Sequence, residues 1–358
     1  MHEQDLPPVL TRREGALGRI TLNRPQALHA LTTEMCTLMS EALRLWAGDG
    51  EVHAVLIDHA GARGFCAGGD IRMLAESGRG DGAQARGFFS AEYRLNTQIH
   101  RFPKPYIAVM DGITMGGGVG VSVHGALRIA TERTTFAMPE TGIGLFPDVG
   151  GGWFLPRLPG ELGTWLALTG ARLKAADCLA AGVATHVVPS AALEAFKAAL
   201  AAGEHAIGQL ATANAIAAGF HSDPGPAPLA ERRAEIDRLF AGESMEAILA
   251  ALKADGGAFA AETLATLATK SPQSLRLTLA QMRKGATLPD FEAVMAMEYR
   301  LAARVAATAD FQEGVRAVIV DKDNAPRWHP PSLSEFPPEA VEPFFAPLPE
   351  GEELRFTS

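Results

Sequence analysis

Short apolar runs alternate with amphipathic stretches along the first 200 residues. The segments His53 to His59 and Tyr106 to Met110 are mostly apolar, as expected of strands buried on both faces. Leu17 to Leu22 alternates and is compatible with a strand. Thr32 or Thr33 is placed to cap a helix, because apolar residues then recur with the helical period up to residue 46. Further elements are predicted at 83–100 (helix), 126–130 (strand) and 184–188 (strand). Repeated strand, loop and helix units indicate an α/β fold.

From about residue 162 to residue 320 the pattern is mostly helical, apart from the strand-like piece at 184–188. Asp223 to Pro228 holds three prolines and a glycine, which interrupt helices and indicate a boundary region. Beyond it the pattern stays helical to about Val320, with Ser244 and Ser271 as candidate N-caps. We therefore predict a core at residues 1–200, a helical region at 201–325 and a proline-rich tail at 326–358 that wraps the surface or is partly disordered.

Composition narrows the class of protein. The 358 residues are 47% hydrophobic and 20% charged, which is ordinary for a globular enzyme. The formal net charge of −9 disfavours a nucleic-acid partner, which normally requires a basic surface. Three cysteines form neither a zinc spacing nor a disulfide framework. The first residues lack signal-peptide features, and no long apolar run indicates a membrane partner, so we expect a cytoplasmic protein.

Two carboxylates, Glu140 and Asp148, lie in a segment from Phe136 to Gly152 that is rich in proline and glycine. Such a segment excludes a regular helix or a central strand. An ionisable group on a stiff, apolar-flanked loop needs a partner or a function, because burying an unpaired charge is costly. The alternative is that both side chains cap helices or close turns, with Asp148 before a glycine-rich helix start.

Two glycine-rich loops lie upstream of that segment. Gly64 to Asp70 and Met115 to Gly120 each follow a strand and precede a helical stretch. Small residues let a ligand approach the backbone, whose N–H groups can then act as donors. The alternatives are a tight turn in which Asp70 caps a helix, and close packing of helix on strand. Together the loops could supply two N–H donors to one carbonyl oxygen, as in an oxyanion hole.

These three stretches carry a resemblance to a known family. Phe65 to Arg72, Gly112 to Gly120 and Phe136 to Gly150 resemble the crotonase (enoyl-CoA hydratase/isomerase) superfamily, in particular its 3-hydroxyisobutyryl-CoA hydrolase branch. Asp321 to Asp323, followed by Trp328, resembles the C-terminal signature of that branch. The resemblance implies a crotonase-type spiral of ββα units followed by a helical C-terminal region.

The resemblance also implies residue roles. Glu140 would attack the thioester as a nucleophile or activate water, and the N–H groups of Ala67 and Gly117 would hold the thioester oxygen. Asp148 and Glu92 would lie around the hydroxyacyl end, although the helical position of Glu92 alone favours a solvent-exposed side chain. Coenzyme A would be part of the substrate, and no metal or other cofactor is implied. The acyl-CoA would also be lined by Gly68, Gly69, Asp70 and Gly116.

Gly120 is a departure from the hydratase pattern. A hydratase carries its second catalytic glutamate at this position, and glycine cannot supply the acid–base group that hydration requires. Hydrolysis needs one activated nucleophile and an oxyanion hole, so the missing glutamate favours the hydrolase. The resemblance implies 3-hydroxyisobutyryl-CoA of valine breakdown as the substrate. The alternatives are an enoyl-CoA hydratase/isomerase that uses Glu140 alone and a non-catalytic acyl-CoA-binding protein. The family resemblance allows a trimer or hexamer, or a monomer.

Overall fold

The computed structural model describes residues 6–356, which form two compact units. The first unit comprises residues up to Gly69, Arg94–Ala137 and Arg172–Ala230. The second comprises Asp70–Tyr93, Met138–Ala171 and residues from Glu231 on. No helix within 6–356 combines the length and apolar character needed to cross a bilayer.

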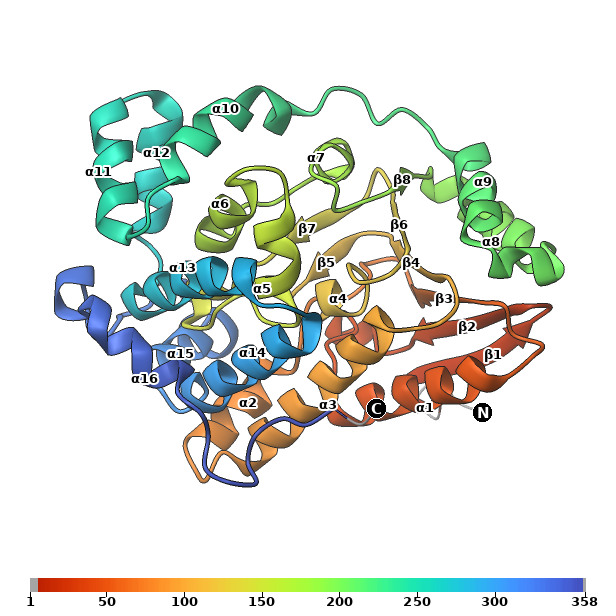
Figure 1. Cartoon of the computed structure of the whole chain (residues 1–358), viewed down its shortest axis with the longest axis horizontal. Helices are drawn as coiled ribbons and strands as arrows, with labels where there is room; N and C mark the ends of the chain where they lie inside the picture. The colour runs from red at the N-terminus through yellow and green to blue at the C-terminus, as the bar shows by residue number, and fades with distance from the viewer. Residues whose placement is uncertain (1–5, 357–358) are drawn as a thin grey trace. The chain divides into compact units, whose positions relative to one another are not determined.

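The first unit is built on a mainly parallel sheet (Figure 1). Its first two strands form an antiparallel hairpin, and every other pair of neighbours is parallel. A second, two-stranded sheet pairs β5 (Ile113–Met115) with β7 (Thr135–Ala137). The six strands of the main sheet are, in spatial order, β1 (Val9–Glu14), β2 (Leu17–Leu22), β3 (Ala54–His59), β4 (Tyr106–Met110), β6 (Leu127–Ala130) and β8 (His186–Val187).

Helices cover this sheet and close its core. Leu56 and Ile107 of the sheet share a buried cluster with Phe196 and Leu200 of α8, because strands buried on both faces need an apolar cover. The helices of the first unit are α1 (Thr33–Gly48), α4 (Gly117–Gly120), α7 (Ala175–Ala180), α8 (Leu193–Ala201) and α9 (Leu210–Phe220), with 3-10 turns at η2 (Pro25–Ala27), η5 (Ser190–Ala192) and η6 (Glu204–Gly208).

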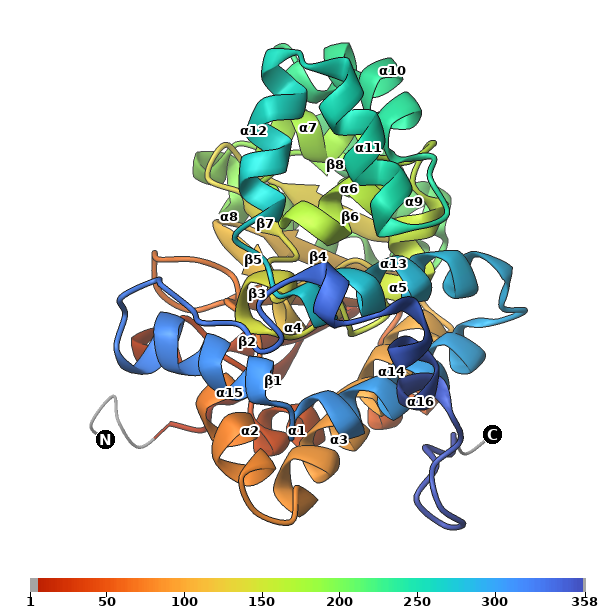
Figure 2. The same cartoon turned by 90° about the vertical axis from the view of Figure 1, so that its left-hand side faces the viewer.

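Within the described residues, the regular elements of the second unit are all helices or helical turns. Helices α11 (Met245–Asp255) and α12 (Ala258–Leu267) lie side by side in both views (Figures 1 and 2). The α3 helix (Ala83–His100) belongs to this unit up to Tyr93. The remaining elements are α2 (Ile71–Gly78), η3 (Glu140–Ile143), α5 (Gly151–Phe154), η4 (Leu155–Arg157), α6 (Leu162–Thr169), α10 (Pro228–Phe240), α13 (Pro272–Thr287), α14 (Phe291–Val305), α15 (Ala309–Val315), the π-helical turn η7 (Arg316–Val320), η8 (Leu333–Glu335), η9 (Pro338–Val341) and α16 (Glu342–Phe345).

Much of the predicted secondary structure is confirmed. The strands at 17–22 and 106–110 and the helix at 83–100 have the predicted bounds. Thr32, Ser244 and Ser271 each accept a hydrogen bond from a backbone N–H as N-caps. The sequence analysis missed β1, β5 and β7. The first is a polar edge strand, and the other two have three residues each and are defined by pairing with each other.

The proline-rich tail packs onto helices of the second unit. Trp328 Nε1 donates to the Thr269 carbonyl oxygen at 3.0 Å, and Arg276 Nε donates to the Phe336 carbonyl oxygen at 2.6 Å. These bonds agree with a tail that wraps a surface. The predicted division of the sequence at residues 200 and 325 stays a prediction.

Candidate active site

Three buried carboxyl groups lie in the second unit. Glu92 on α3, Glu140 in η3 and Asp148 before α5 are 2%, 4% and 5% exposed. Within the described residues, Glu92 Oε1 and Glu140 Oε2 are buried without any hydrogen-bond partner. A buried polar atom with no partner is costly, and in a native protein it calls for a functional explanation. These carboxyls are therefore the strongest candidates for substrate-facing groups.

Burial raises the pKa of all three groups, and repulsion by neighbouring carboxyl groups adds to this effect at Glu92 and Glu140. Burial raises the pKa of Glu92 well above its usual value, and the negative charges of Asp148 and Glu140 add to this effect. Burial and then Asp148 raise the pKa of Glu140 in the same way, against a smaller opposing effect of Lys270. Burial raises the pKa of Asp148 to about 7. An acidic group with a pKa near 7 is suited to proton transfer at neutral pH.

The Glu140 loop is held by close backbone packing. Gly144 adopts φ 74°, and a Cβ atom there would come within 2.3 Å of the Asp310 carbonyl group on α15. A Cβ atom on Gly314 would likewise come within 2.3 Å of Ile143. Both positions therefore need glycine, the first also for its left-handed backbone. The close packing of α15 against this loop therefore fixes the backbone position of Glu140.

Asp148 is held by a tyrosine. The Tyr93 hydroxyl donates to Asp148 Oδ2 at 2.9 Å, and the Tyr93 ring packs edge-on against Tyr299. The alternative that Asp148 caps the following helix is wrong, because the N-cap of α5 is Gly150 and no side chain caps it. The surface position expected for Glu92 from its helix alone is also wrong, since the side chain is buried.

Asp70, which begins the second unit, has the structural role that the sequence left open. Its Oδ1 accepts a hydrogen bond from Met73 N at 3.4 Å and caps α2. The interpretation as a helix cap is thus confirmed. A contact of Asp70 with the acyl-CoA stays a prediction, as it does for Gly68, Gly69 and Gly116.

In the first unit, the two glycine-rich loops lie against each other. Cys66 N donates to the Ile113 carbonyl oxygen and Met115 N to the Cys66 carbonyl oxygen, both at 2.9 Å. A Cβ atom on Gly118 would come within 2.4 Å of the Cys66 oxygen, so a side chain cannot be accommodated there without movement. Cys66 itself is buried, with Sγ 3.2 Å from the His29 carbonyl oxygen, and fits the role of a small packed residue.

The structure does not support Ala67 as an oxyanion donor. Its N–H donates to the Leu28 carbonyl oxygen at 3.0 Å and is therefore already paired. Within residues 6–356, the N–H groups of Gly69 and Gly117 donate to no acceptor in the chain. Gly117 is the first residue of α4, where a helix leaves its N–H groups free. In this loop, Gly69 is therefore a better candidate than Ala67. The distinction depends on the hydrogen bond between Ala67 and Leu28, which are remote in the sequence.

Two polar residues near Asp148 were missed by the sequence analysis. Glu298 on α14 is fully buried and accepts hydrogen bonds from Gly150 N and Gly152 N. Gln281 on α13 donates to Glu298 and to the Pro147 carbonyl oxygen. A signal for Glu298 was present, because Val294 and Leu301 place it on an apolar helix face. Among the described residues, no group of three or more His, Cys, Asp or Glu could hold a metal ion.

Known proteins similar to this chain share its length and its fold. The sequence model of the enoyl-CoA hydratase/isomerase family matches residues 17–345. The mitochondrial 3-hydroxyisobutyryl-CoA hydrolase of Gallus gallus is 45% identical over 97% of this chain and 91% of the relative. The enzyme of that name from Danio rerio is 47% identical over 96% of this chain and 90% of the relative.

Two solved structures have different names. A carnitinyl-CoA dehydratase from Mycobacterium thermoresistibile is 43% identical with a TM-score of 0.91, covering 98% of this chain and 99% of its own. An enoyl-CoA hydratase from Rhodobacter sphaeroides 2.4.1 is 42% identical with a TM-score of 0.87, covering 98% and 100%. These likenesses confirm the crotonase-type fold. The expected cytoplasmic location is contradicted, because the hydrolases that this chain resembles are named as mitochondrial.

Proposed function

We propose that this chain, which belongs to the enoyl-CoA hydratase/isomerase family, hydrolyses 3-hydroxyisobutyryl-CoA to 3-hydroxyisobutyrate and coenzyme A. Relatives that are 43–47% identical over nearly the whole chain and are named as this hydrolase support the proposal. The observation that favours hydrolysis over hydration is Gly120, which leaves α4 without a carboxylate. A role in valine breakdown follows from this substrate.

In the proposed reaction, the N–H groups of Gly117 and Gly69 hold the thioester oxygen while Glu140 starts the attack. Glu140 either attacks the carbonyl carbon itself, so that the C–S bond breaks and an anhydride forms that water then hydrolyses to the free acid and Glu140, or removes a proton from a water molecule that attacks the carbonyl carbon. The thiolate leaves with the bonding electrons and takes up a proton. One oxyanion donor is worth roughly 3 kcal/mol of transition-state stabilisation. The raised pKa of Glu140 makes its ionised form a stronger base and nucleophile.

Asp148 and Glu92 are proposed to bind the hydroxyl group of the acyl chain. The raised pKa of Glu92 favours the protonated form of this carboxyl group, which can donate a hydrogen bond as well as accept one. Asp148 has its Oδ2 occupied by Tyr93, which orients the carboxyl group. Two oriented carboxyl groups suit recognition of one hydroxyl group by complementary hydrogen bonds.

The decisive experiment measures thiol release from 3-hydroxyisobutyryl-CoA beside hydration of crotonyl-CoA, on one protein preparation. Thiol release without hydration would support the proposal. Hydration without thiol release would favour the second candidate, an enoyl-CoA hydratase/isomerase, as the names of the two solved structures suggest. Binding of the acyl-CoA without either reaction would favour the non-catalytic alternative. The control is Glu140→Gln, which should remove thiol release and keep binding.

A further inference from the structure

The segment that carries Asp148 is bonded to a carboxyl group on a distant helix. Glu298 Oε2 accepts a hydrogen bond from Gly150 N at 2.8 Å, and Oε1 accepts one from Gly152 N at 2.7 Å. Glu298 is 0% exposed, and no Lys, Arg or His of the described residues forms an ion pair with it. The two loop N–H groups therefore supply its main stabilisation, and each carboxyl oxygen is used.

Gln281 completes this arrangement from α13. Its Nε2 donates to Glu298 Oε1 at 3.1 Å and to the Pro147 carbonyl oxygen at 2.7 Å. A Cβ atom on Gly152 would come within 3.1 Å of Glu298 Oε1 and 3.2 Å of Gln281 Nε2. The glycine therefore lets both side chains reach the loop. Pro147, Gly150 and Gly152 are thus held on either side of Asp148.

The backbone between these anchors is in an unfavourable conformation. Val149 has φ 52° and Gly150 has φ 86°, so both lie in the left-handed region. For a β-branched residue such as Val149 this conformation costs on the order of 1–3 kcal/mol and persists only when its surroundings impose it. Gly150, the residue directly after Val149, donates one of the hydrogen bonds to Glu298. These bonds are therefore well placed to hold Val149 in its left-handed conformation.

We propose that Glu298, held by Gln281, is a positioning residue that fixes Asp148 toward the substrate through the backbone of Gly150 and Gly152. The inference deepens the proposed function, because it takes Asp148 to be a substrate-binding group. Glutamate suits this role better than glutamine, since two N–H groups point at its two oxygens. An amide at position 298 would direct its own NH2 group at one of these donors.

The test is a double-mutant cycle with Glu298→Gln and Asp148→Asn, measured as kcat/KM for thiol release. If Glu298 acts through Asp148, Glu298→Gln should lower kcat/KM about tenfold in the wild-type background and less than about twofold beside Asp148→Asn. Equal losses in both backgrounds would overturn the proposal, because they would show a general structural role. The matched control is Glu161→Gln, which loses an acceptor for Arg283 elsewhere in the same unit and should act additively with Asp148→Asn.

A second measurement does not depend on turnover. Amide hydrogen exchange of the peptide that spans residues 147–152 should become faster in Glu298→Gln and stay unchanged in Glu161→Gln. Unchanged exchange in Glu298→Gln would overturn the proposal whatever the activity. Absence of thiol release in the wild type would overturn the proposed function instead, and the exchange result would then decide whether Glu298 holds the loop.

Discussion

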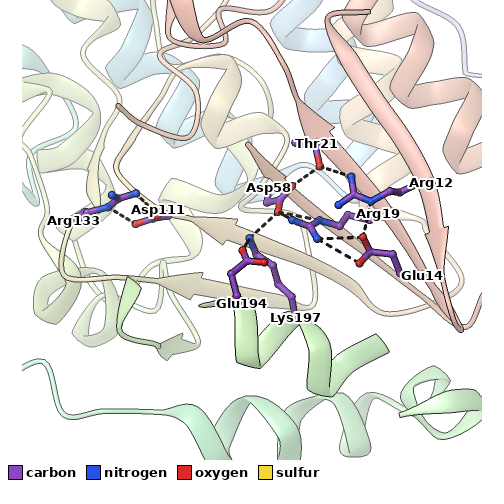
Figure 3. Close-up of polar contacts among 9 residues, drawn as sticks. All are labelled: Arg12, Glu14, Arg19, Thr21, Asp58, Asp111, Arg133, Glu194 and Lys197. Carbon is purple, nitrogen blue, oxygen red and sulfur yellow. Dashed lines mark hydrogen bonds and ion pairs between the residues drawn. The ribbon is translucent and has the colours of Figure 1, made fainter. Parts of the chain in front are cut away.

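Two sets of buried carboxyl groups in this protein differ in their partners. In the first unit, Asp58 is 1% exposed and accepts hydrogen bonds from Arg19 at 2.6 Å and Thr21 at 2.7 Å (Figure 3). It also pairs with Lys197 at 2.9 Å. Burial by itself would raise the pKa of Asp58, but Lys197 and Arg19 outweigh burial and lower it. In the second unit, Glu92 and Glu140 each have an oxygen with no partner among residues 6–356, and their pKa values are raised.

The difference shows that burial of a carboxyl group does not by itself indicate function. Asp58 is at least as buried as Glu140, yet its hydrogen bonds and charge are satisfied inside the fold. Asp111, paired with Arg133 in the same unit, follows the pattern of Asp58 (Figure 3). The groups that lack protein partners are those whose interactions remain available for a substrate.

The largest expected effect is the loss of activity when a carboxyl group of the second unit is replaced. Glu140→Gln should lower thiol release by about 10³-fold, within the range for loss of a catalytic acid–base group. The unfolding free energy should stay the same or rise, because a neutral amide replaces a carboxyl group whose ionisation is unfavourable. Steady-state kinetics and urea unfolding on the same preparation measure both. Near-normal turnover would contradict the assignment of Glu140.

The next effect is on stability. Asp58→Asn should lower the free energy of unfolding by about 3 kcal/mol, because it leaves the charges of Arg19 and Lys197 without their buried counter-charge. Urea unfolding measures the loss, while kcat of the folded protein should stay near normal. Asp111→Asn is the matched control and should cost less, since its partner Arg133 is 39% exposed at the side chain. If Asp58→Asn were as stable as the wild type, Asp58 would not be a structural group, and the contrast with Glu140 would fail.

A third prediction tests the backbone donors of the first unit. Gly118→Ala places a Cβ atom within 2.4 Å of the Cys66 oxygen and should push the two glycine-rich loops apart. Displacing one oxyanion donor should lower kcat/KM roughly tenfold to hundredfold. Gly219→Ala in α9 is the control, because its Cβ atom would have no neighbour within 4 Å. Unchanged kcat/KM in Gly118→Ala would speak against Gly117 and Gly69 as donors.

The smallest effect is a dependence of stability on pH. The folded-state pKa of Asp148 is raised from 3.8 to about 7 by burial, and burial also raises the pKa of Glu140 well above 4.5. Groups with raised values bind protons more tightly when folded, so their contribution is complete below the unfolded pKa and is lost as pH rises through the folded one. Tm should therefore fall by a few degrees between about pH 5 and pH 8.

Measuring variants in the same pH series tests which groups cause the fall in Tm. Asp148→Asn should flatten the fall in Tm, since it removes one of the groups with a raised pKa. Asp58 has a lowered pKa and acts in the opposite sense, so its contribution is lost only as pH falls below its unfolded value of 3.8. Thermal unfolding followed by circular dichroism measures both. A Tm that rises from pH 5 to pH 8 would contradict the raised values in the second unit.

Local features were predictable from the sequence. The apolar runs at 17–22 and 106–110 form strands, and Thr32, Ser244 and Ser271 cap helices, because these properties depend on neighbouring residues. The motif stretches led to the fold class and to Glu140, Asp148 and Gly117 as candidates. Strands β5 and β7 were missed, because three residues carry too little pattern and only their pairing defines them.

The amino-acid sequence by itself determined the α/β fold class, the family and the residues that stand in its motifs. The tertiary structure decided how each group is partnered. It buries Glu92 with no partner for Oε1 in the described part of the chain and pairs the Ala67 N–H with Leu28. It also brings Glu298 to the loop of Asp148, although Glu298 and Gly150 are 148 residues apart in the sequence. The physical reason is that desolvation and hydrogen bonding depend on all neighbours in space, and most of these neighbours are remote along the chain.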